Sequence, residues 1–183
     1  MTDIDPTDPK ALVSFGAMMS RGTILTCYAN FEWWLAEWIL QASAMPEYAN
    51  LQLDFSRTIE KRLKAIKAIL KADGPFNQYA AEAIDLVEKI EIHEERRNFM
   101  AHAVMGIDFE TEPPTVLFRM YKMFKGGVMT PGIIHTNLDQ LRNYETELTL
   151  ALAEFTRLLR RVWREQGLPI MKVDWKPPPD STE

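Results

Sequence analysis

The sequence predicts an all-α fold, a four-helix-bundle-like domain with a small antiparallel β-hairpin inserted between helices three and four. Apolar side chains recur at helical spacing over most of the 183 residues, as expected for amphipathic helices. Proline and glycine separate the helical stretches. One stretch, about 106–136, changes to the short alternating pattern of strands. A hydrophobic content of 46% with 26% charged residues is typical of a single soluble globular domain.

The first helix is expected from about Lys10 to Met45, with a break near Gly22. Residues 1–9 contain three Asp and two Pro and are expected to be a disordered lead-in. The second half of this helix carries a broad apolar stripe, which we assign to the core: Phe31, Trp34, Leu35, Trp38 and Ile39. Trp33 lies off the stripe, which makes it a candidate for contact with another chain.

The second helix is expected from about Ser56, a candidate N-cap, to Ala72. Its apolar stripe, which we also assign to the core, consists of Ile59, Leu63, Ile66 and Leu70. The opposite side is strongly basic and carries Arg57, Lys61, Arg62, Lys64, Lys67 and Lys71. Such a side is either a solvated surface or a track for an RNA backbone, with Lys61 and Lys64 as candidate contacts.

A third helix is expected over about 76–104, and its middle is acidic. Gly106 ends this helix, and short strands follow near 107–109, 115–124 and 128–135. They form the hairpin insert. Because the hairpin directly follows the third helix, we expect it to form one wall of a cleft there, with Arg119 as a candidate RNA contact.

The last helix is expected over about 137–166, with Thr136 or Asn137 as its N-cap. Leucine, tyrosine, phenylalanine and valine recur along one side of it at helical spacing. Arginines gather in its final turns, where they complement the negative end of the helix dipole. The single helical domain is therefore expected to span 10–170, followed by a Pro-rich tail over 171–183.

The most informative stretch is 90–105, which reads IEIHEERRNFMAHAVM. On one continuous helix, a polar stripe would consist of Glu91, Glu95, Asn98 and His102. The apolar residues Ile92, Phe99 and Ala103 would face the core. Histidine exchanges a proton near neutral pH, so it can act as general base and then as general acid. Arginine stays charged and presents a planar fork that suits a phosphate.

The run Arg97-Asn98-Phe99-Met100-Ala101-His102 resembles the motif of the HEPN family. In that motif an arginine and a following polar residue precede a histidine by about four to six residues. HEPN domains are small helical bundles, and many are metal-independent endoribonucleases of toxin–antitoxin and antiphage systems. The resemblance implies that Arg97 and His102 are a catalytic pair and that Asn98 is the polar residue beside them. Arg96 fits the pattern at the longer spacing and is also a candidate RNA contact.

The resemblance further implies an RNA substrate, a cyclic 2′,3′-phosphate product and no cofactor. It also implies a homodimer, because family members usually bring two motifs together across a two-fold interface. An antitoxin or other protein partner would suit a toxin or an antiphage-defence effector. Arg97 and His102 are five residues apart and diverge by about 140° on a straight helix. This spacing is compatible with a dimeric site that two copies share.

Other interpretations of the same residues remain open. Arg96 and Arg97 can instead form structural ion pairs with Glu91, Glu94 or Glu95, while His102 only ends the helix. A non-catalytic HEPN-like module can bind RNA, a nucleotide or a protein without turnover. A plain helical interaction protein can use its Trp-rich surface to bind another chain.

Charge, cysteine content and hydropathy indicate which classes of protein this chain can belong to. The formal net charge of −5 argues against a general nucleic-acid binder, although segregated charge can still form a local site. The only cysteine is Cys27, which excludes an intramolecular disulfide and fits a reducing cytoplasm. One Cys and three His match no zinc-ligand spacing, so we expect no metal site. No apolar run is long enough to cross a bilayer and the acidic N-terminus is unlike a signal peptide, so we expect a cytoplasmic protein without membrane association.

Overall fold

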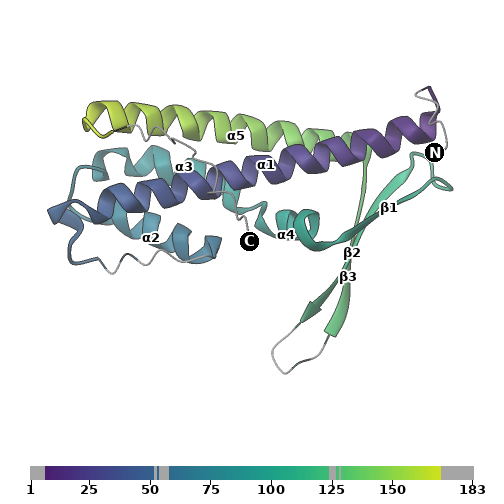
Figure 1. Cartoon of the computed structure of the whole chain (residues 1–183), viewed down its shortest axis with the longest axis horizontal. Coiled ribbons are helices and arrows are strands. Elements are labelled where there is room, and N and C mark those ends of the chain that lie inside the picture. The colour runs from purple at the N-terminus through teal and green to yellow at the C-terminus, as the bar shows by residue number, and fades with distance from the viewer. Residues whose placement is uncertain (1–6, 52, 54–57, 124–126, 128, 170–183) are drawn as a thin grey trace, which may run out of the picture.

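A computed structural model describes residues 7–51, 53, 58–123, 127 and 129–169 (Figure 1). The tail 171–183 and most of the lead-in 1–9 lie outside these residues, as does Ser56, the expected N-cap of the second helix. The described residues form five α-helices and a three-stranded antiparallel sheet. This mostly helical architecture, with strands between the third and last predicted helices, confirms the helical class that the sequence predicts.

The helices are α1 (Pro9–Ser43), α2 (Ile59–Lys71), α3 (Ala80–Glu91), α4 (Glu94–His102) and α5 (Leu138–Glu165). The strands are β1 (Val104–Asp108), β2 (Thr115–Met123) and β3 (Met129–Asn137). Helices α1 and α5 lie side by side along the length of the molecule (Figure 1). Helices α2 and α3 pack at one end of this pair, and α4 and the sheet lie toward the other end.

Helix α1 is continuous, so the expected break near Gly22 is wrong. The helix begins with a capped turn, in which the Asp8 carboxylate accepts a hydrogen bond from the backbone N–H of Lys10 at 3.0 Å. Ala17 and Ile24, on either side of Gly22, are both fully buried. Burial against the rest of the bundle therefore outweighs the roughly 1 kcal/mol by which a mid-helix glycine weakens a helix.

Aromatic side chains fill the core at the end where α2 and α3 pack. The Trp38 ring lies 5.7 Å from that of Phe76 and 5.9 Å from that of Trp163, in edge-to-face arrangements. The predicted core stripes are confirmed for α2 and largely for α1, where Trp34 is only half-buried. The last helix begins with a capping box, in which Asn137 and Gln140 exchange hydrogen bonds, so Asn137 is the N-cap.

The predicted third helix is broken at Ile92–His93 into α3 and α4, which is a correction to the single helix expected over 76–104. Ile92, expected to face the core, is 75% exposed. The buried Tyr28 hydroxyl donates to the Ile90 carbonyl at 3.0 Å, and the Tyr144 hydroxyl donates to the His93 carbonyl at 3.4 Å. The Ile90 and His93 carbonyls also accept backbone N–H groups, of His93 and Arg97 respectively. The two tyrosines therefore add a second hydrogen bond on each side of the interruption and attach it to α1 and α5.

The sheet has strand order β1-β2-β3, and β1 begins earlier than the sequence predicts. The inner face of its central strand buries Val116 and Phe118 completely. Gly132 of β3 lets the sheet approach α4 closely, because a Cβ there would lie only 2.9 Å from Cζ of Phe99. The outer face of the sheet stays exposed, and the sheet joins α4 to α5.

Candidate functional site

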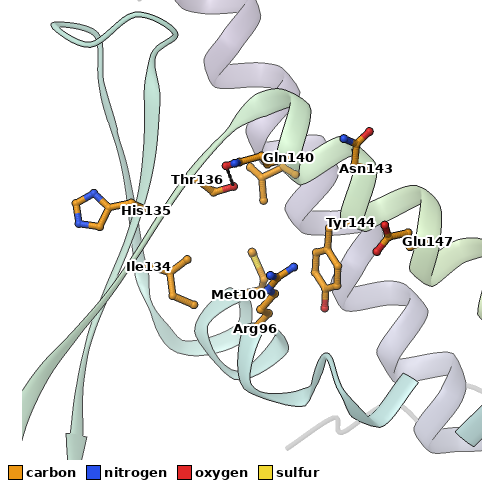
Figure 2. A pocket seen from close by; sticks show the side chains of 10 residues that line it. Arg96, Met100, Ile134, His135, Thr136, Gln140, Asn143, Tyr144 and Glu147 are labelled. Carbon is orange, nitrogen blue, oxygen red and sulfur yellow. Dashed lines mark hydrogen bonds between the residues drawn. The ribbon is translucent and has the colours of Figure 1, made fainter. Parts of the chain in front are cut away.

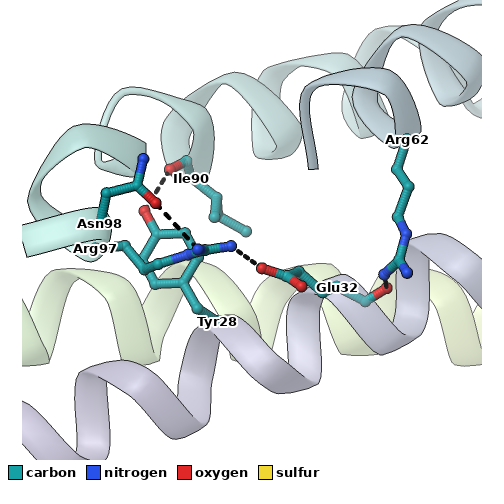
Figure 3. Close-up of polar contacts among 6 residues, drawn as sticks. All are labelled: Tyr28, Glu32, Arg62, Ile90, Arg97 and Asn98. Atoms are coloured by element: carbon teal, nitrogen blue, oxygen red, sulfur yellow. Dashed lines mark hydrogen bonds and ion pairs between the residues drawn. The ribbon is translucent and has the colours of Figure 1, made fainter. Parts of the chain in front are cut away.

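The motif arginine Arg97 points from α4 toward α1 (Figure 3). Its guanidinium forms an ion pair with Glu32 of α1 and lies 5.7 Å from the Tyr28 ring centroid. Its Nη1 also donates a hydrogen bond to Oδ1 of Asn98 at 3.0 Å. The Arg97 side chain is only 18% exposed. Arg97 therefore fixes α4 against α1 and fixes the Asn98 side chain at the same time.

The partner of Arg97 differs from those expected from the sequence. Glu91 instead pairs with Lys67 at 2.6 Å, and Glu95 pairs with Lys122 at 2.6 Å. Glu32 lies 65 residues away in the sequence, and only the packing of α1 on α4 brings it to Arg97. Sequence reasoning missed Glu32, because nothing in the local pattern of α1 distinguishes it from other solvated acids.

His102 lies on a different side of α4, where it is exposed beside β2. The cleft there has a volume of about 510 Å³ and is lined by Glu94, Glu95, Asn98, Phe99, His102, Met120, Tyr121 and Lys122. The expectation that the strands form one wall of a cleft next to the motif is thereby confirmed. Asn98 lines this cleft and accepts a hydrogen bond from Arg97, which does not line it. Asn98 therefore links the two motif residues.

Charged groups from both walls meet across the cleft. Lys122 of β2 reaches Glu95 of α4, and its ammonium lies 4.6 Å from the Phe99 ring centroid. The hydrogen bond from Lys122 lowers the pKa of Glu95, which is therefore ionised at neutral pH. Burial raises the pKa of Glu94, although nearby Arg97 opposes the rise. The cleft thus holds an imidazole, an amide, an ammonium and two carboxylates.

A second cleft of about 580 Å³ adjoins His102 on the outer side of the sheet. It is lined by His102, Val104, Arg119, Met120, Tyr121, Pro131, Gly132 and Ile133. Arg119, predicted as an RNA contact, is exposed there. His102 of α4 lines both clefts, so a ligand in either cleft can reach its imidazole.

Arg21 of α1 holds the end of α4 that carries His102. Its Nε donates to the Met100 carbonyl at 2.7 Å and its Nη2 donates to the Ala103 carbonyl at 3.0 Å. Met100 lies in the last turn of α4 and Ala103 directly follows the helix, where carbonyls have no further helical donors. Sequence reasoning missed Arg21, since it lies at the very place where a break in the first helix was expected.

Arg96 lies in a separate pocket between α4, β3 and α5 (Figure 2). Its guanidinium lies 5.5 Å from the Tyr144 ring centroid, and Gln140, Asn143 and Glu147 complete the polar lining of a volume of about 310 Å³. The imidazole of His135 points away from these side chains (Figure 2). Arg96 is thus the more exposed of the two arginines, but it lines neither of the two clefts described beside His102.

Lys61 and Lys64, predicted as weak RNA contacts, are exposed on α2. Neither lines a cleft next to His102. Within the described residues, no group of three or more His, Cys, Asp or Glu side chains lies close enough together to hold a metal ion. None of the helices described has the length and apolar character required to span a membrane.

Comparisons with known proteins give no relative: no protein-family model, no curated protein and no solved structure matches the chain.

Proposed function

We propose that the chain is a metal-independent endoribonuclease of the HEPN type that acts in the clefts beside His102. The observation that carries this proposal is that the exposed His102 imidazole lines two clefts, one that also contains Arg119 and one that also contains Lys122. Asn98 supports it further, because this amide lines the same cleft and is held by the motif arginine. An acid–base group next to cations is what cleavage of a phosphodiester requires.

In the proposed reaction the His102 imidazole removes the proton of a ribose 2′-hydroxyl. The 2′-oxygen attacks the adjacent phosphorus, and the bond from phosphorus to the 5′-oxygen breaks. The products are a cyclic 2′,3′-phosphate and a 5′-hydroxyl, whose proton comes from water or from the protonated imidazole. Arg119 stabilises the charge that grows on the phosphate, and Asn98 positions the phosphate or the imidazole.

The role of Arg97 follows from its ion pair with Glu32. For direct contact with the phosphate, which the resemblance implies, Arg97 would have to leave Glu32. It would also have to reach the clefts beside His102, which it does not line in its own protomer. We therefore assign it as a positioning residue that fixes Asn98. A homodimeric site, in which Arg97 of one copy meets the partner's His102, is the untested alternative that the resemblance implies. A role as toxin or antiphage effector with an antitoxin partner stays a prediction.

Cleavage of a mixed RNA pool in EDTA tests the proposal. We expect the wild type to leave cyclic 2′,3′-phosphate ends and His102→Ala to be slower by about 100-fold or more. His135→Ala is the matched control, because this histidine is also exposed but lines neither cleft beside His102. Equal inertness of all three proteins, or equal activity of wild type and His102→Ala, contradicts the proposal.

Mixing Arg97→Ala with His102→Ala separates the two roles of Arg97. Heterodimers of the mixture regain one complete site if Arg97 of one copy serves His102 of the other. They regain none if Arg97 acts only within its own protomer, which is the result we expect. Circular dichroism first establishes that both proteins are folded, and Arg97→Lys replaces Arg97→Ala if the alanine variant does not fold.

A non-catalytic HEPN-like module that binds RNA, a nucleotide or a protein is the second candidate. The Arg97–Glu32 ion pair favours it, because an arginine engaged inside the fold is unavailable for catalysis. This candidate predicts that the wild type binds RNA without cutting it. His102→Ala would then leave the binding affinity largely unchanged.

A further inference from the structure

The outer face of the sheet is an exposed surface that carries large apolar side chains. Val104, Tyr121, Met129 and Ile133 are 68%, 69%, 61% and 51% exposed, respectively. Proteins rarely leave several such side chains together in water unless the surface binds something. The inner face, in contrast, is packed, with Val116 and Phe118 of β2 completely buried. One face of β2 therefore packs in the core, whereas the other is available to bind a ligand.

The strand register brings the outer side chains into two neighbouring rows. Val104 of β1, Arg119 of β2 and Ile133 of β3 lie directly opposite one another. Tyr121 and Pro131 form the next row. Directly opposed residues of antiparallel strands point to the same face, so a cation lies between two aliphatic side chains and beside an exposed aromatic ring. We call these five residues the outer patch.

The outer patch is continuous with the proposed reaction site. All five of its residues line the cleft of about 580 Å³ that also contains His102. A strand of RNA with one phosphodiester at His102 therefore has its neighbouring nucleotides over the patch. Aromatic side chains stack on unpaired bases, and arginine binds the phosphates between them.

The charge of the outer patch favours a polyanion over a second copy of the chain. The two rows contain Arg119 and no carboxylate, in a protein whose formal net charge is −5. A two-fold contact through this patch would place Arg119 of one copy near the partner's Arg119, because such an interface uses the same surface twice. Like charges brought together in this way are unfavourable.

We propose that the outer patch binds the single-stranded RNA on which His102 acts, with Tyr121 stacking on a base and Arg119 contacting the adjacent phosphate. The choice of RNA rests on the proposed function. Stacking requires bases that are not paired, so the patch selects single-stranded over double-stranded substrate.

Fluorescence anisotropy with a labelled single-stranded RNA of about 12 nucleotides tests the proposal. His102→Ala serves as the background, so that the probe stays intact. We expect Tyr121→Ala and Arg119→Ala each to weaken binding about tenfold, whereas Tyr121→Phe retains it because the ring is kept. A duplex of the same sequence should bind more weakly than the single strand.

Two matched controls and one independent measurement complete the experiment. Leu150→Ala, which removes an exposed apolar side chain of α5, is the control for Tyr121→Ala. Arg160→Ala, which removes an exposed arginine of the same helix, is the control for Arg119→Ala. Neither control residue lines the cleft of the outer patch. Unchanged affinity in Tyr121→Ala and Arg119→Ala overturns the proposal, even if the wild type cleaves RNA. Size-exclusion chromatography in which Tyr121→Ala converts a dimer to a monomer also overturns it, since the patch would then join two copies. Binding without cleavage by the wild type refutes the proposed function but leaves the binding of single-stranded RNA by the outer patch standing.

Discussion

The two sides of α4 differ in what they do with their charged residues. Toward α1, Arg97 is held by Glu32, Asn98 and the Tyr28 ring and is largely withdrawn from solvent. Toward the sheet, His102 is exposed between two clefts. The angle of about 140° between residues five apart on a helix produces this separation. A nine-residue helix thus anchors the fold with one motif residue and leaves the other exposed at the two clefts.

Arg97→Ala should give the largest loss of stability among the variants considered. It leaves Glu32 without its partner in a partly shielded place, which should lower the free energy of unfolding by about 2 kcal/mol. Urea denaturation measures this value. Arg96→Ala, one position earlier, is the control and should cost less than about 1 kcal/mol, because an exposed contact with the Tyr144 ring contributes little to stability. Equal costs for the two variants would mean that the Arg97 side of α4 is not the anchor.

Arg21→Met tests the anchor at the other end of α4. Methionine keeps much of the side-chain volume but donates no hydrogen bond, so the carbonyls of Met100 and Ala103 lose their partner. We expect the free energy of unfolding to fall by about 1.5 kcal/mol, and hydrogen exchange of the last turn of α4 to accelerate. Arg21→Lys, which retains a cation, should lose less. Unchanged exchange in Arg21→Met would show that this arginine does not hold the helix end.

Gly132→Ala should move the sheet away from α4. The added methyl group would lie 2.9 Å from the buried Phe99 ring, so the two elements have to separate slightly. Crowding of this kind should cost about 1 kcal/mol of unfolding free energy, measured by thermal unfolding, and should slow cleavage at His102 as well. Gly22→Ala is the control, because a Cβ there meets no atom within 4 Å and alanine favours a helix. A neutral Gly132→Ala would contradict the close approach.

The smallest effect concerns pH and the interruption between α3 and α4. Burial, and then Arg96, lower the pKa of His93 below its ordinary value of 6.5. The unfolded chain therefore binds this proton more readily than the folded protein, so stability is greatest above pH 6.5 and falls as the pH drops below that value. His93→Asn should reduce this fall, with a change in Tm of less than about 3 °C. Burial raises the pKa of Glu94, which acts in the opposite direction but equally in both proteins. Parallel Tm profiles of wild type and His93→Asn would exclude His93 as a source of the pH dependence.

Local patterns predicted the elements whose causes are local. The last helix is an example, because Asn137 and Gln140 form its capping box within one turn. The interruption at Ile92–His93 has a distant cause: Tyr28 and Tyr144 reach it from other helices and bind its carbonyls. No pattern within the stretch 90–105 contains that information, so one helix was expected where there are two.

The candidate site shows the same limit. Its residue types, His102 and the arginine before it, were visible in the sequence, and so was the adjacent strand that carries Arg119. The partner that withdraws Arg97 was not visible, because Glu32 is 65 residues away. The outer patch was missed as well, since its members come from three strands and meet only through the strand register.

The most direct measurement is the RNA cleavage rate per folded molecule of wild type and His102→Ala, in EDTA, with urea denaturation of the same preparations. His102 is exposed, so its replacement by alanine should change the free energy of unfolding by less than about 0.5 kcal/mol. We expect cleavage to fall by about 100-fold or more in this equally stable protein, and the wild type to leave 2′-O-methylated RNA intact. Cleavage that survives in His102→Ala, or that proceeds on RNA without free 2′-hydroxyls, would contradict catalysis by His102.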